Sequence, residues 1–110
     1  RDFIFAQDVA RGMMLVVEKG ETRPVNLGSG VGCTIKEIVD IVVSNMDVKP
    51  EVVWDTSKLA GDKKRLMDIT RAGELGFVAM VSLQEGIKQT MEWYKMHRTE
   101  TGKRFNVFTS

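Results

Sequence analysis

The stretch PVNLGSGVGCTIKE, residues 24–37, guides the interpretation of the whole sequence. Its first four residues have the character of a short strand, and a glycine-rich turn follows from Gly28 to Gly32. Thr34 and Glu37 then match a capping box, in which a hydroxyl accepts a backbone N–H at the start of a helix and the glutamate reaches back. The stretch therefore predicts a strand, a tight turn and a helix.

The same signals recur on both sides of this stretch. Short strands are expected at residues 3–5, 24–27 and 51–54. Helices are expected at residues 8–19, 35–46, 70–75 and 83–98. Asp8 is expected to be the N-cap of the first helix, and Ser82 with Glu85 forms a second capping box before the last. The alternation predicts an α/β fold, in which a small sheet of short strands packs with about four helices.

Length and composition indicate one globular domain. The chain has 110 residues, of which 43% are hydrophobic and 28% charged. Residues 1–98 are expected to form the folded lobe and residues 99–110 a polar tail. The net charge of +1 argues against a nucleic-acid-binding protein and against a polybasic membrane anchor. No apolar run approaches the roughly 18 residues of a membrane-spanning helix.

Cys33 is the single cysteine of the sequence. It cannot form an internal disulfide, and it has no neighbouring Cys or His with the spacing of a zinc site. We therefore expect no metal, and a reducing, cytoplasmic setting.

The glycine turn does not match a dinucleotide-binding fingerprint. That motif, GxGxxG, opens a helix directly after a strand. Here the third glycine, Gly32, comes one residue too early. The turn is therefore interpreted as a tight connection between a strand and a helix.

The basic run Lys63-Lys64-Arg65 is the best candidate for binding an anion. Ammonium and guanidinium groups suit the oxygens of a diphosphate. On composition alone, such a run is more typical of a solvated loop.

Several stretches resemble, in order and spacing, the extended short-chain dehydrogenase/reductase proteins that act as nucleotide-sugar epimerases and dehydratases. The similarity is greatest to the GDP-fucose synthase-like members, although Leu59-Ala60 and Lys63 depart from the Pro-Asp and Pro of that pattern. The stretches are RDFIFAQDVA (1–10), NLGSG (26–30), TIKE (34–37), DTSKLAGDKKRLMD (55–68), DITRA (68–72) and VSLQEGI (81–87). The resemblance implies the C-terminal, substrate-side lobe of a Rossmann-type epimerase, without its Rossmann core.

The resemblance also implies a set of site residues. Arg1, Lys64 and Arg65 would contact the diphosphate of a nucleotide sugar, which is GDP-linked in the most similar members. Asn26, Gly28 and Gly30 would form a loop of the substrate lobe. The missing Rossmann half would be a partner, and it would hold the NAD or NADP that the parent family uses.

The catalytic pair of that family is missing here. It consists of a tyrosine followed four residues later by a lysine. The only tyrosine is Tyr94, and position 98 is arginine, which cannot replace the lysine in lowering a tyrosine pKa. His97 stands alone without partners for catalysis. We therefore expect no catalytic residue, no cofactor bound by this chain alone and no activity of its own.

An alternative function is a non-catalytic binding or assembly module. A lobe that normally covers a cofactor domain exposes apolar surface, and the expected consequence is a homo-oligomer. The candidate contact residues are Met13, Met14, Leu15, Phe105 and Phe108.

Overall fold

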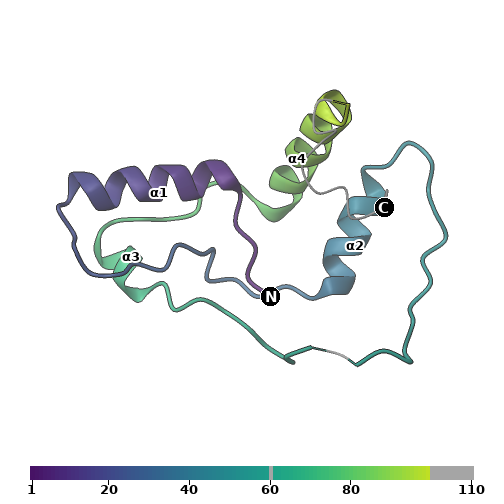
Figure 1. Ribbon diagram of the computed structural model, residues 1–110, viewed down its shortest axis with the longest axis horizontal. Helices are drawn as coiled ribbons and strands as arrows, with labels where there is room; N and C mark the ends of the chain where they lie inside the picture. Colours follow the sequence, from purple (N-terminus) through teal and green to yellow (C-terminus); the bar gives the residue numbers. More distant parts are fainter. Residues whose placement is uncertain (60, 100–110) are drawn as a thin grey trace.

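The computed structural model describes residues 1–59 and 61–99, and its helices lie at the expected places (Figure 1). They are α1 (Ala6–Glu18), α2 (Ile35–Ser44), α3 (Thr70–Glu74) and α4 (Leu83–His97). Each end lies within two residues of the prediction, so the helical part of the predicted fold is confirmed. Residues 100–110 of the expected tail, including Phe105 and Phe108, lie outside the described residues.

The predicted sheet is wrong for the described part of the chain. Residues 3–5, 24–27 and 51–54 form no strand there. The ladder contact that is present is an isolated antiparallel bridge between Asp2 and Gly32. A strand needs a partner that takes up its backbone N–H and C=O groups, and these three segments do not pair with one another. Within residues 1–59 and 61–99, the fold is helices joined by extended segments.

Local signals explain where the helices begin and end. The Thr34 hydroxyl accepts the N–H of Glu37 at 3.1 Å, and the Glu37 carboxylate accepts the N–H of Thr34 at 2.6 Å, which confirms the capping box. Ser82 Oγ accepts the N–H of Glu85 at 3.2 Å at the start of α4. Gly20, just after α1, and Gly76, just after α3, take left-handed φ values of 62° and 90°.

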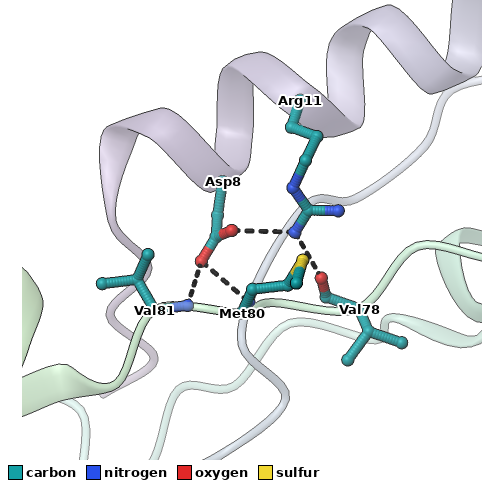
Figure 2. Close-up of polar contacts among 5 residues, drawn as sticks. All are labelled: Asp8, Arg11, Val78, Met80 and Val81. Atoms are coloured by element: carbon teal, nitrogen blue, oxygen red, sulfur yellow. Dashed lines mark hydrogen bonds and ion pairs between the residues drawn. The ribbon is translucent and has the colours of Figure 1, made fainter.

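Asp8 is not the N-cap of α1. Phe5 takes that position, and Asp8 lies in the first turn with an exposed fraction of 2%. Its carboxylate turns away from the helix and accepts the backbone N–H groups of Met80 and Val81 at 3.0 and 2.9 Å. Arg11 bridges the Asp8 carboxylate and the carbonyl of Val78 (Figure 2). The aspartate therefore joins α1 to a distant segment, a role that a local capping pattern cannot reveal.

The best-buried contacts of the described chain lie beneath α1. Ala72 and Phe77 have exposed fractions of 1% and 4%. Gly12 faces this cluster, because a Cβ there would lie 2.8 Å from a methyl group of Leu27 and 2.9 Å from the Phe77 ring. The guanidinium of Arg11 covers the same ring at 5.3 Å from its centroid. The absence of a side chain at residue 12 thus lets α1 approach closely.

The second packing unit joins α2 to α4. No residue of α2 is buried, and Ile35 is 50% exposed, so the apolar stripe of this helix is only partly covered. Lys49 donates to the carbonyls of Val43, Ser44 and Met46 at 2.7–3.0 Å, which satisfies acceptors at the end of α2.

The molecule is open in shape. Its radius of gyration is 16.8 Å, against about 13 Å for a compact domain of this length. Between α2 and α3 the chain follows a long arc along the edge of the molecule (Figure 1). Large apolar side chains remain exposed, among them Met14, Val17, Val53 and Met80 at 62–81%. Among the described residues, no helix is both long and apolar enough to cross a membrane.

Candidate functional site

Arg1 is fixed at both its backbone and its side chain. Its backbone nitrogen donates to the carbonyl of Cys33 at 2.7 Å, and the N–H of Cys33 donates to the carbonyl of Arg1 at 2.9 Å. Its guanidinium Nη1 donates to the carbonyl of Asp62 at 2.8 Å. The structure therefore brings Arg1 to the segment that carries the basic run, two residues before Lys64.

The glycine loop lies against the same segment. A Cβ on Gly28 would lie 2.9 Å from the Met67 Cβ, and a Cβ on Gly30 would lie 2.5 Å from Ile69 Cδ1. Gly30 has a φ of 71°, which favours glycine. Asn26 donates through Nδ2 to the carbonyl of Asp68 at 3.2 Å. The three predicted loop residues thus pack along residues 67–69.

Lys64 and Arg65 complete the predicted set and are both exposed. Within residues 1–59 and 61–99, neither side chain takes part in a hydrogen bond or an ion pair with another residue. These two cations therefore remain available to an anion from solution.

Asp2 connects the parts of this site, although the sequence patterns did not single it out. Its Oδ1 accepts the N–H and the hydroxyl of Ser29 at 2.9 and 2.6 Å. Its Oδ2 accepts the N–H groups of Gly30 and Met67 at 3.1 and 3.4 Å. Burial of the carboxyl raises the pKa of Asp2, but these hydrogen bonds lower it by more. The pKa therefore lies below its ordinary value. The only sequence signal for this role is the position of Asp2 beside Arg1.

A pocket of about 580 Å³ borders the glycine loop. Ser29 to Cys33, excluding Gly30, contribute to one wall, and α2 and the start of α4 contribute to others. Apolar groups such as Phe3, Ile41 and Leu83 mix in its lining with polar ones. The polar side chains are Ser29, Glu37, Asp40, Ser82 and Gln84. Such a mixed lining suits a ligand that carries both ring faces and hydroxyl groups.

The residues considered for catalysis lie on α4, outside this pocket's lining. Tyr94 is 58% exposed. The imidazole of His97 stacks on Trp93 with 4.7 Å between ring centroids, and its Nδ1 lies 2.8 Å from the Trp93 carbonyl oxygen. In the described residues, no group of three or more His, Cys, Asp or Glu side chains could hold a metal ion.

Comparison with curated proteins identifies related sequences, although no protein-family description matches the chain. A protein of Arabidopsis thaliana provisionally named GDP-L-fucose synthase 2 is 37% identical over 95 residues, which cover 86% of this chain. The GDP-L-fucose synthase of Escherichia coli strain K12 is 33% identical over 104 residues, again 86% of this chain. A protein of Methanocaldococcus jannaschii provisionally named UDP-glucose 4-epimerase is 30% identical over 96 residues, also 86% of this chain.

The chain spans 29%, 32% and 31% of the length of these three relatives. Their names agree with the resemblance carried by the ordered stretches between Arg1 and Tyr94. Over 86% of its length, the chain is therefore similar to proteins of the GDP-L-fucose synthase-like epimerase/reductase family.

Proposed function

We propose that this chain binds the diphosphate of a nucleotide sugar and forms the substrate side of a GDP-L-fucose synthase-like enzyme. The observation that carries the proposal is the course of residues 61–69, which contact both Arg1 and the loop of residues 26–30. Arg1 therefore contacts Asp62, which lies two and three residues before the exposed cations Lys64 and Arg65. Guanidinium and ammonium groups form charge-assisted hydrogen bonds with diphosphate oxygens.

The pocket beside the glycine loop supports a site for the rest of the ligand. Its volume of about 580 Å³ lies within the range of roughly 300–1,000 Å³ that is usual for small-molecule sites. Glu37, Asp40 and Gln84 offer acceptors and donors for sugar or ribose hydroxyls. The names of the relatives favour GDP as the nucleoside diphosphate, with UDP as the second choice.

In this proposal, catalysis requires residues that the segment 1–110 does not supply. The expected Tyr–Lys pair is missing, because Tyr94 is followed at position 98 by arginine. In this proposal a Rossmann-type half, contributed from outside residues 1–110, binds NAD or NADP and carries the catalytic residues. Residues 1–98 are then the substrate lobe, in a cytoplasmic enzyme.

A panel of thermal unfolding measurements tests the binding function. The ligands are GDP, UDP, CDP, dTDP, their sugars and NAD(P). A ligand at 100 times its Kd adds about 2.7 kcal/mol of stability, which raises the Tm of a chain this size by roughly 10 °C. We expect a rise with one nucleoside diphosphate and none with NAD(P).

Charge-removing variants supply the control. Lys64→Gln together with Arg65→Gln should abolish the ligand-dependent rise without changing the unliganded Tm, because both side chains are exposed. Lys88→Gln, on the exposed side of α4, should leave the rise intact. Absence of a rise with every nucleoside diphosphate would contradict the proposal.

Exposed apolar surface supports a second candidate function, assembly with another protein surface. Met13, Met14 and Val17 on α1 are 61%, 62% and 75% exposed. A largely apolar pocket of about 400 Å³ also lies between α2 and α4, lined in part by Ile38 and Met91. Light scattering at high micromolar concentration tests this function: a homo-oligomer supports it, and a monomer counts against it.

A further inference from the structure

Four hydrogen-bond donors converge on the carboxylate of Asp2. Three donor groups, from Ser29 and Gly30, come from the glycine loop, and the fourth comes from Met67. These residues are 27, 28 and 65 positions away in the sequence. One side chain therefore joins three segments, and these are the segments that carry the predicted site residues.

The backbone beside Asp2 is held equally firmly. Arg1 exchanges two hydrogen bonds with Cys33, and Asp2 is bridged to Gly32. The Arg1 side chain leaves this anchored backbone and reaches the carbonyl of Asp62. A guanidinium on a fixed backbone loses less conformational freedom when it binds an anion than one on a mobile backbone.

The same hydrogen bonds decide which groups can receive an anion. Backbone N–H groups of a glycine turn can form a concave anion site. Here the N–H groups of Ser29 and Gly30 already donate to a carboxylate. A phosphate at that position would displace the carboxylate or meet its charge, so the free cations beyond the loop are the better site.

We propose that Asp2 is a positioning residue for anion binding. It fills the donors of the glycine loop and holds Arg1 in register with residues 61–67, so that Arg1, Lys64 and Arg65 face one diphosphate. This role rests on the proposed function. Asp2 touches no ligand itself and acts through Arg1.

A double-mutant cycle on binding tests this role in the natural protein that carries the sequence. The Kd of GDP, and of UDP, is measured by calorimetry for the unaltered protein, Asp2→Asn, Arg1→Gln and the double variant. In Asp2→Asn an amide N–H₂ group replaces one carboxylate oxygen. Hydrogen bonds from the N–H groups that face this oxygen are then lost, with little change in the shape of the side chain. We expect each single variant to weaken binding about tenfold, equal to about 1.4 kcal/mol.

The double variant separates a positioning role from a general structural one. If Asp2 acts through Arg1, the double variant should bind no more weakly than either single variant, because the effects are coupled. Asp2→Glu, which keeps the charge, should restore part of the affinity. Asp55→Asn is the matched control, since Asp55 accepts the N–H and hydroxyl of Ser57 at 3.0 and 2.5 Å and, within the described ranges 1–59 and 61–99, joins no distant segment.

The outcomes distinguish the two proposals. If neither GDP nor UDP binds to the unaltered protein, the proposed function and the positioning role both fail. If Arg1→Gln weakens binding and Asp2→Asn does not, the positioning role alone fails. A hundredfold loss in the double variant, or an equal loss in Asp55→Asn, would also overturn it.

Discussion

Asp2 and Asp8 each bind a distant segment through backbone N–H groups, but their surroundings differ. Asp8 is 2% exposed and shares its carboxylate with a cation, Arg11. Asp2 is half-buried, and its hydrogen-bond donors are a hydroxyl and backbone N–H groups. The first arrangement joins α1 to residues 78–81 over the buried cluster. The second lies where residues 1–2, 29–30 and 66–67 meet, beside exposed cations. We therefore expect Asp8 to contribute mainly to stability and Asp2 mainly to the geometry of the proposed site.

The largest expected effect is the loss of stability when Asp8 is truncated. Asp8→Ala removes a buried acceptor from two backbone N–H groups and from Arg11, and we expect a loss of about 3 kcal/mol. Asp2→Ala should cost about half as much, because the site is more open to water. Urea unfolding with an unchanged m value measures both. An equal or larger loss for Asp2→Ala would break the comparison.

Glycine substitutions should show the same difference between tight and open packing. Gly12→Ala forces a Cβ to within 2.8–3.0 Å of Leu27 and Phe77, and overpacking of this kind costs about 2 kcal/mol. Gly73→Ala, in α3, meets nothing within 4 Å and should stabilise by up to about 1 kcal/mol. Thermal unfolding of the two variants shows whether each substitution raises or lowers the Tm. A stabilising Gly12→Ala would contradict the close approach of α1.

Both aspartates should make stability depend on acidic pH. Burial raises the pKa of Asp8, but hydrogen bonds from Arg11, Val81 and Met80 lower it more, and the pKa of Asp2 is also lowered. A lowered pKa in the folded state adds stability above the unfolded value of about 3.9, and the gain is lost as pH falls through the folded value.

The measurement is Tm between pH 7 and pH 2.5. We expect the unaltered protein to lose stability below about pH 4. Asp8→Asn should reduce the loss of Tm below about pH 4, and the double variant with Asp2→Asn should reduce that loss further. A profile in the double variant as steep as that of the unaltered protein would assign the acid sensitivity to other carboxyl groups.

The smallest expected effect concerns the helix caps. Thr34→Ala removes the hydroxyl half of the capping box of α2, whereas the backbone N–H of residue 34 can still donate to Glu37, and should cost about 1 kcal/mol. Ser82→Ala removes a 3.2 Å bond at the start of α4 and should cost about 0.5–1 kcal/mol. Urea unfolding measures the difference. A larger loss for Ser82→Ala would show that the contact of α4 with α2 depends on where α4 begins.

Local patterns in the sequence predicted the helices because their signals are local. The hydroxyl of Thr34 and the carboxyl of Glu37 act within one turn, and Gly20 and Gly76 end helices through their own φ values. Strands depend on partners elsewhere in the chain, so segments such as residues 24–27 resemble strands in sequence and yet have no pairing partner among residues 1–59 and 61–99.

The site was predictable only in part for the same reason. The resemblance named Arg1, Gly28 and Gly30, and the structure brings all three to residues 61–69. Asp2 and Asp8 were missed or misassigned, because an aspartate that binds N–H groups 65 or 73 residues away leaves no local periodicity. Whether Lys64 and Arg65 bind phosphate stays a prediction.

The arc between α2 and α3 is a place where the polypeptide could be divided into two pieces. Trypsin should cut first at its exposed basic residues, such as Lys58, because exposed loops are the preferred sites of nicking. The hydrogen bonds of Asp2 with Met67 and of Asp8 with Val81 join the two sides of that cut, and so does a hydrogen bond from the Arg71 guanidinium to the carbonyl of Pro24. Two separately expressed pieces would carry complementary halves of every one of these contacts. The protein is therefore a natural starting point for a split reporter, in which reassembly of the halves produces the signal.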